Sequence, residues 1–237
     1  MNINCAIQEG TKFLKNKNIL SAHLDSEILM AKAINKDRKF ILLNLEKNLL
    51  NKDLINFYKL IKKRSLRKPV AYLTNKKFFW KSEFFVTKDT LIPRPDTEML
   101  VDCILEYSKN KNKQNILDIG IGSGCILLSI LKEKKKFIGT GIDIRKETLN
   151  ICKINAVKLN VINRLKLFKT NVDKFNVGKY DLIVSNPPYI NKNKIKYLDR
   201  DVASYEPLMA LDGGLDGLSE IKKVICKSSE LIKKNGK

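Results

Sequence analysis

The chain has 237 residues, with 46 Lys or Arg against 25 Asp or Glu, and a formal net charge of +21 at pH 7. This length can bury a full hydrophobic core and allows one large domain beside a smaller one. No apolar run is long enough to span a membrane, no signal-peptide core is seen, and a single histidine, His23, argues against a multi-histidine metal site. We expect a cytoplasmic protein with no membrane contact and no metal ion.

The positive charge is a weak indicator of nucleic-acid binding. Clustered cations supply most of the sequence-independent affinity for phosphates, but arginine is sparse here and lysine is spread over every predicted surface. Lysine, asparagine and isoleucine are all abundant, as an AT-rich coding sequence would produce. We therefore expect that nucleic acid is not required, and that the charge supports at most a weak association with RNA.

Residues 1–70 predict a small helical domain. Apolar residues recur at helical spacing in three stretches, and Ser21 and Asn51 stand where they could cap the second and third helices. Lys68-Pro69 ends the pattern. Residues 71–95 then predict a β-hairpin and a linker, because two aromatic stretches, 77–80 and 83–86, flank Lys81-Ser82.

The end of this linker, Leu91 to Pro95, is extended by its two prolines. Arg94 is held rigidly between them just before the next domain, so we expect it to order a loop of the site or the ligand itself. Asp96 or Thr97 starts the following helix. For these two residues a helix cap and a functional role both remain open.

From residue 96 to residue 237 the pattern alternates between strands and helices. This alternation predicts a doubly wound α/β domain with a parallel sheet, whose ligand lies at the carboxyl ends of the strands. The expected strands are 115–119, 137–142, 165–169 and 180–184, and the expected helices are 123–133, 146–160 and 219–234.

The first of these strands runs into a glycine-rich loop, Gly120-Ile121-Gly122-Ser123-Gly124. Glycine permits positive φ and close approach to a ligand, which is typical of a cradle for a nucleotide-type cofactor. The loop is neither G-x-G-x-x-G nor a Walker loop. Asp143 ends the next strand, where a carboxylate can bind two ribose hydroxyls. Asp118 is the other candidate carboxylate.

A polar corner, Asn186-Pro187-Pro188-Tyr189, follows the fourth strand. Two prolines fix φ and remove two backbone donors, so the carbonyls of Asn186 and Pro187 can accept from a ligand beside the Asn186 amide. This set suits the NH2 group of a carboxamide or of adenine, with Tyr189 packed on its plane. The plain alternative is an Asn-Pro turn.

Together these residues resemble the S-adenosylmethionine-dependent methyltransferases that act on amino groups. The segments Leu91–Glu98, Val184–Ile190 and Glu206–Leu211, with Gly213, Gly214 and Gly217-Leu218, resemble more closely the release factor glutamine methyltransferase family. The resemblance implies a Rossmann-like class I methyltransferase sheet behind a helical domain that binds class I peptide chain release factors. It implies N5-methylation of the glutamine in their Gly-Gly-Gln motif.

The resemblance also implies site roles. The loop Gly120 to Gly124 would hold the methionine part of S-adenosylmethionine and Asp143 its ribose. Asn171 stands where the family has an acidic residue near the adenine. Residues Asn186, Pro187, Pro188 and Tyr189 would bind the substrate amide, with catalysis by Asn186, Pro187 and Tyr189, and Asn186 would also contact the cofactor.

The family's sheet has further strands after the last helix, whereas this sequence stops at Gly236-Lys237. We therefore expect a C-terminally incomplete sheet, with an open apolar edge that favours aggregation. Two other functions remain: an adenine-N6 methyltransferase of DNA or RNA, which would flip its base into the same corner, and a non-catalytic truncated remnant that binds release factor. The Arg94 segment disfavours the first, and the missing strands support the second.

Overall fold

The computed structural model describes residues Met1–Lys237, which separate into two compact units. The first unit joins Met1–Asn75 with Arg200–Tyr205, and the second joins Lys76–Asp199 with Glu206–Lys237. The chain has no helix with both the length and the apolar character needed to cross a bilayer.

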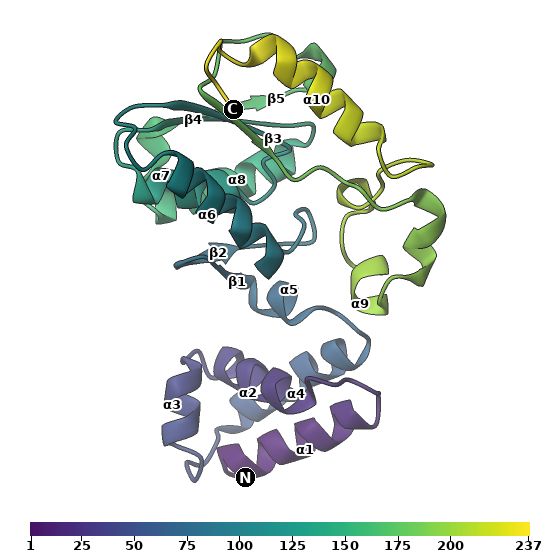
Figure 1. Ribbon diagram of the computed structural model, residues 1–237. Coiled ribbons are helices and arrows are strands. Elements are labelled where there is room, and N and C mark those ends of the chain that lie inside the picture. Colours follow the sequence, from purple (N-terminus) through teal and green to yellow (C-terminus); the bar gives the residue numbers. More distant parts are fainter. The chain divides into compact units, whose positions relative to one another are not determined.

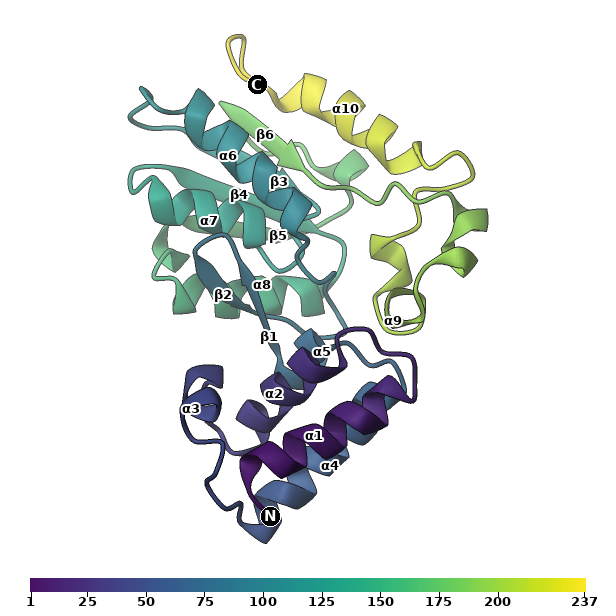
Figure 2. The same ribbon diagram turned by 60° about the horizontal axis from the view of Figure 1, so that its bottom comes forward.

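The first unit is a helical bundle (Figure 2). Its core is formed by apolar side chains that repeat at helical spacing, among them Leu14, Leu29 and Phe57, all fully buried. A Cβ on Gly10 would lie 2.8 Å from the Phe57 ring, so this glycine lets two helices pack closely. The helices are α1 (Ile3–Lys15), α2 (Ala22–Ala33), α3 (Arg38–Leu43), α4 (Asn51–Ser65) and α5 (Val70–Thr74).

Neither predicted cap makes a capping hydrogen bond. Asn51 is the first residue of α4 itself, and Leu50 occupies the N-cap position. Ser21 does precede α2, but its hydroxyl donates to Asp25 Oδ2 at 2.9 Å rather than accepting from the helix backbone. Side-chain caps occur instead at Asn2 for α1 and at Asp37 for α3.

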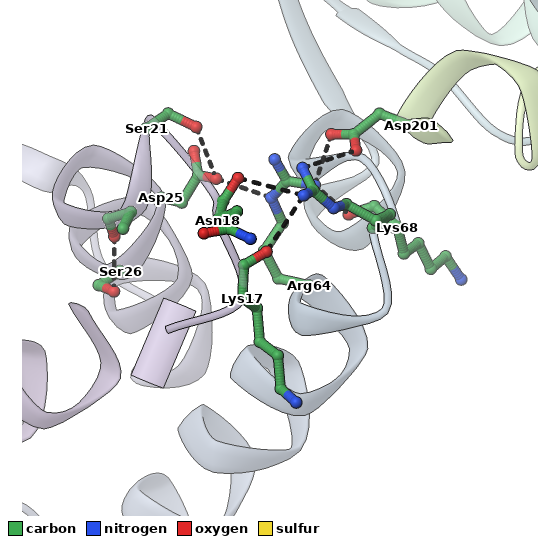
Figure 3. A network of polar contacts seen from close by, with 10 residues as sticks. Lys17, Asn18, Ser21, Asp25, Ser26, Arg64, Lys68 and Asp201 are labelled. Atoms are coloured by element: carbon green, nitrogen blue, oxygen red, sulfur yellow. Dashed lines mark hydrogen bonds and ion pairs between the residues drawn. The ribbon is translucent and has the colours of Figure 1, made fainter. Parts of the chain in front are cut away.

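Arg64 of α4 connects the helices of this unit to the segment Arg200–Tyr205, which also belongs to the unit but lies far along the chain (Figure 3). Its Nε donates to Asp25 Oδ2 at 2.7 Å, and its Nη1 donates to Asp201 Oδ2 at 2.6 Å. The side chains of Arg64 and Asp25 are each only 7% exposed. Tyr205 adds a hydrogen bond of 2.7 Å from its hydroxyl to the Leu66 carbonyl. The segment Arg200–Tyr205, which includes α9 (Arg200–Ala203), is thereby fixed to the helical unit.

The second unit begins with the hairpin of β1 (Lys76–Phe79) and β2 (Ser82–Phe85). Its turn is Trp80-Lys81, one residue earlier than the sequence pattern predicted, because Trp80 takes the left-handed φ of 54° and Ser82 already pairs with Phe79. Asn155 of α8 (Lys146–Lys158) exchanges two hydrogen bonds with the backbone of Phe85, which ties the hairpin to the rest of this unit.

The sheet is parallel, with the order β5-β4-β3-β6. Its strands are β3 (Asn115–Ile119), β4 (Ile138–Asp143), β5 (Leu165–Lys169) and β6 (Leu182–Ser185), within two residues of the predicted ranges. Because all four strands are parallel, their carboxyl ends meet at one edge. The predicted doubly wound Rossmann-like fold is confirmed.

Alternate residues of β3 face opposite sides of the sheet. Ile116 packs in a core with α6 (Glu98–Tyr107), α7 (Cys125–Glu133) and α8, whereas Leu117 packs in a second core that includes Leu231 of α10 (Ser219–Leu231). In Figure 1, α10 lies on one side of the sheet, and α6, α7 and α8 lie on the other.

The strand β6 is partly paired on its outer side. The backbone of Ile183 donates to the Lys237 carbonyl at 2.8 Å, and Tyr180 forms a parallel bridge with Ile232. The tail after α10 therefore covers the start of β6.

Candidate active site

A cavity of about 470 Å³ opens at the carboxyl ends of the parallel strands. Every residue to which the family resemblance gave a role lines it except Gly124 and Tyr189, and the further candidate Asp118 also lies outside the lining. The predicted residues in the lining are Gly120, Ile121, Gly122, Ser123, Asp143, Asn171, Asn186, Pro187 and Pro188. The structure thus brings together segments that follow four different strands, as expected for a ligand site in a doubly wound sheet.

The three loop glycines all adopt positive φ, at 75° for Gly120, 58° for Gly122 and 82° for Gly124. A Cβ on Gly120 would meet nothing within 4 Å, so its backbone faces open space. A Cβ on Gly124 would lie 2.7 Å from Leu128 and 2.8 Å from Cys152. Gly124 therefore serves the packing beneath the loop, while Gly120 and Gly122 present backbone to the cavity.

Asp143 braces this loop from the next strand. Its Oδ2 accepts from the Gly122 backbone N–H at 3.2 Å, and its Oδ1 accepts from the Arg145 backbone N–H at 3.1 Å. Burial raises the pKa of Asp143, and these N–H groups counteract the effect. The carboxylate stands at the cavity wall, where it can also accept from ligand hydroxyls.

Asp118 lies beneath the loop rather than in the cavity lining. It is 1% exposed, and its Oδ2 has no hydrogen-bond partner. Complete burial, with a smaller contribution from the charge of Asp143, raises the pKa of Asp118 to about 7, although the carboxyl accepts from the Leu127 backbone at the start of α7. Of the two candidate carboxylates, Asp143 is the one placed to meet a ligand.

At the cavity wall after β5, Asn171 uses its Oδ1 to accept from the Asp173 backbone N–H at 3.2 Å. Its amide nitrogen is left as a donor. Helix α10 contributes Glu220 and Lys223 to the same cavity, and these two side chains form an ion pair of 2.7 Å. The sequence analysis missed both residues.

The Asn186 side chain is held in place at the polar corner. Its Nδ2 donates to the Thr97 hydroxyl oxygen at 3.3 Å, which leaves its carbonyl oxygen as the acceptor. Thr97, whose role the sequence left open, also lines the cavity. Tyr189 is 63% exposed and outside the lining, so its packing against a substrate stays a prediction.

A glycine-rich segment supports the corner from behind. A Cβ on Gly213 would lie 2.8 Å from Tyr189 Cα, and one on Gly217 would lie 2.6 Å from the Tyr189 carbonyl oxygen. The backbone N–H of Gly213 also donates a hydrogen bond to the Ile190 carbonyl at 2.9 Å. These glycines therefore let the segment approach more closely than any side chain would allow.

No group of three or more His, Cys, Asp or Glu side chains is arranged to hold a metal ion. His23 is exposed and lies 3.2 Å from Glu27 in the helical unit.

Two family models match the chain: the PrmC N-terminal domain over residues 6–74 and the Methyltransferase small domain over residues 95–202. The release factor glutamine methyltransferase of Clostridium acetobutylicum is 36% identical over 239 residues, which cover 100% of this chain and 84% of that protein. The enzyme of the same name from Buchnera aphidicola subsp. Schizaphis graminum is 38% identical, over 98% of this chain and 82% of that protein.

The chain belongs to the release factor glutamine methyltransferase family.

The wider fold is shared with a more distant enzyme. The hMettl16 catalytic domain, solved in complex with the MAT2A 3′UTR hairpin 6, aligns with a TM-score of 0.52 and 15% identity over 63% of this chain and 58% of that one. At this identity the likeness shows the class I methyltransferase fold alone.

In a release factor glutamine methyltransferase the methyl donor is S-adenosylmethionine, and the residues present fit it. The cavity volume lies within the range of about 300–1,000 Å³ that is usual for small-ligand sites. Gly120 and Gly122 leave room for close approach, and Asp143 supplies a carboxylate at a strand end. The predicted cofactor is thereby confirmed.

Proposed function

We propose that this protein transfers the methyl group of S-adenosylmethionine to the side-chain nitrogen of the glutamine in the Gly-Gly-Gln motif of class I release factors. The observation that carries the proposal is the Asn186 amide, held by Thr97 at the wall of the cavity that the glycine loop lines. The names of the relatives support the substrate class, and the Asn186 corner supports an amide as the acceptor.

We assign the cofactor contacts to three segments. The loop Gly120 to Gly124 holds the methionine part, Asp143 holds the ribose, and Asn171 lies against the adenine. Gly124 acts from below the loop, because its own surroundings are Leu128 and Cys152. Asn171 can donate from Nδ2 to a ring nitrogen of adenine, since its Oδ1 is already bonded to Asp173.

The acceptor amide binds at the corner. The side-chain oxygen of Asn186 and the backbone carbonyl of Pro187 accept from the two N–H groups of the substrate NH2, and Tyr189 and Pro188 pack against its plane. These two hydrogen bonds return electron density to the nitrogen and fix the direction of its lone pair.

When bound, S-adenosylmethionine supplies a methyl group activated by a positive sulfonium. The amide nitrogen would form the new bond to the methyl carbon, and the sulfur would keep the electron pair of the broken carbon–sulfur bond and leave as a neutral thioether. The nitrogen then releases its extra proton to water. No side chain has to act as a strong base, so the chain's contribution is orientation and hydrogen bonding at Asn186 and Pro187.

The helical unit is proposed to recognise the body of the release factor. Large apolar side chains are exposed on it and are therefore available to contact a protein partner. These side chains are Leu20, Leu43, Leu50, Ile55 and Leu66. We place the reaction in the cytoplasm, where release factors act on the ribosome.

The net charge of +21 favours one competing function, methylation of adenine in DNA or RNA. To separate the two, the protein is incubated with methyl-labelled cofactor and with release factor, a release factor whose Gly-Gly-Gln glutamine is replaced, DNA, or RNA. We expect label only on the intact release factor, and at most weak RNA binding that falls steeply with salt. Label on nucleic acid alone would overturn the proposal. Binding of release factor without any label would indicate a non-catalytic remnant.

A further inference from the structure

The segment Asp89–Thr97, here called the strap, runs along the cavity. Its residues Asp89, Thr90, Leu91, Pro93, Arg94 and Thr97 all contribute to the lining. The strap lies between the hairpin and α6 in sequence, but its residues form hydrogen bonds with three segments that are distant in sequence.

At its first end, the strap is fixed near the proposed ribose site. Arg145 Nη2 lies 2.9 Å from Asp89 Oδ1, and the Thr148 hydroxyl donates to the Asp89 carbonyl at 3.1 Å. Arg145 is also the residue whose backbone N–H donates to Asp143.

In its middle, the strap is fixed by Glu206. Arg94 Nη2 donates to Glu206 Oε1 at 2.6 Å, and the Ile92 backbone N–H donates to Glu206 Oε2 at 3.1 Å. The Glu206 side chain is 1% exposed, whereas that of Arg94 is 35% exposed. A carboxylate buried this deeply is stable only when its charge is compensated and its oxygens are bonded. The buried carboxylate of Glu206 is therefore stabilised by both of its hydrogen bonds to the strap.

At its last end, the strap reaches the acceptor corner. Arg94 precedes the single 3₁₀ turn Pro95–Thr97, and the Thr97 backbone N–H donates to the Arg94 carbonyl at 3.1 Å. Pro95 stiffens this turn. The Thr97 hydroxyl then accepts from Asn186 Nδ2. Only this short, rigid turn separates the Glu206 contact from the Asn186 contact.

We propose that Glu206 is a positioning residue for methyl transfer. Its hydrogen bonds to the Ile92 backbone and the Arg94 side chain, here called the lock, fix the turn that carries Thr97. The Thr97 hydroxyl in turn fixes the Asn186 amide with its oxygen toward the acceptor. This inference rests on the proposed function, because it assigns Asn186 to the acceptor. Glu206 itself touches neither substrate nor cofactor.

Three variants test the lock. Glu206→Gln leaves one acceptor for two donors and turns an NH2 group toward the other donor. Arg94→Met leaves a buried carboxylate without its cation. In the double variant the oxygen of the introduced glutamine can still accept from Ile92, and no unpaired charge remains. Glu106→Gln is the matched control, because it removes the same charge from an 80% exposed side chain of the second unit.

In steady-state kinetics with release factor, we expect Glu206→Gln to lower kcat about 3- to 10-fold, the size expected for loss of the one hydrogen bond, from Asn186 to Thr97, through which Glu206 acts. The KM for release factor and the Kd for S-adenosylhomocysteine should change less than about 3-fold, since the helical unit and the glycine loop are untouched. Arg94→Met should lower kcat more than Glu206→Gln does, and the double variant should have a higher kcat than Arg94→Met. A loss confined to KM, or a double variant no better than Arg94→Met, would overturn the inference.

Hydrogen–deuterium exchange decides the same point without turnover. With S-adenosylhomocysteine bound, Glu206→Gln should speed exchange both in the strap and in the segment 186–192, while Glu106→Gln changes neither. Faster exchange in the strap alone would show that the lock does not reach the corner. If the wild-type protein labels no release factor, the proposed function is wrong, and the exchange experiment still decides whether Glu206 positions Asn186.

Discussion

The Asn186 amide nitrogen lies 3.3 Å from the hydroxyl oxygen of Thr97, a residue 89 positions earlier in the chain. Thr97 thus selects which end of the amide faces the cavity. Thr97→Val keeps the shape of the side chain and removes the acceptor, so the Asn186 amide can rotate. We expect kcat to fall about 3- to 10-fold, equivalent to about 1 kcal/mol for one neutral hydrogen bond. Thr97→Ser should restore the rate, and equal rates in the Val and Ser variants would show that the hydroxyl has no such role.

Asn186→Ala removes the proposed acceptor of the substrate N–H. We expect transfer to be abolished, while the Kd for S-adenosylhomocysteine, measured by calorimetry, stays within a few-fold, because Asn186 mainly orients the acceptor nitrogen. A loss of cofactor affinity as large as the loss of rate would reassign Asn186 to the cofactor.

Asp143→Ala should have the opposite effect. It removes a charged acceptor for the ribose and also the brace on Gly122, so cofactor affinity should weaken by about 1–3 kcal/mol. Asp102→Ala, an exposed carboxylate on α6, is the control. Calorimetry that gives the same Kd for Asp143→Ala and the control would remove Asp143 from the site.

Asp118 predicts a pH-dependent stability. Burial raises its pKa in the folded protein to about 7, from an ordinary value of 3.8. The folded state therefore holds a proton that the unfolded state has released, and the contribution of Asp118 is lost as the pH rises between about 4 and 7, at up to about 1.4 kcal/mol per pH unit. The pKa of Asp143 is also raised and acts in the same direction.

For this reason the measurement compares two proteins. Urea unfolding between pH 5 and 8 should show a decline in the free energy of unfolding that is steeper in wild type than in Asp118→Asn, which cannot ionise. Parallel curves would mean that Asp118 is already ionised in the folded state.

Asp201→Asn weakens the contact between Arg64 and the segment Arg200–Tyr205. Arg64 is buried and keeps Asp25, so we expect a loss of about 1–3 kcal/mol in the free energy of unfolding of the helical unit. Asp216→Asn, which removes an exposed ion pair with Lys222, should leave the melting curve of the protein unchanged. Equal melting curves for the two variants would contradict a structural role for the buried contact.

The local parts of the fold could be predicted from the sequence. The strand β3, the glycine loop and Asp143 follow one another within a short stretch, so periodicity and glycine spacing were enough to place them. The hairpin turn was displaced by one residue because Trp80 adopts a left-handed φ that its residue type does not suggest.

The contacts that orient the site could not be predicted in this way. Glu206 meets Arg94 across 112 positions, and Glu220 and Lys223 join Asn171 in the cavity wall only because α10 packs beside the turn after β5. Such pairs depend on the folded topology, and no local periodicity reports them. The segments around Arg94 and Glu206 were both noted for their family resemblance, but nothing in the residue pattern indicated that the two side chains pair.

The contact of Arg64 with Asp201 also determines when, during translation, the helical unit can be completed. The two residues are 137 positions apart, so Arg64 leaves the ribosome with Asp25 as its one carboxylate partner until Asp201 follows. At about 5–20 residues per second, that interval is roughly seven to thirty seconds. The unit that begins first is therefore completed late, after the whole parallel sheet has been translated. Its helices spend that time as a nascent bundle in which Arg64 lacks its hydrogen bond to Asp201, and this is the stage at which a chaperone or a protease would meet them.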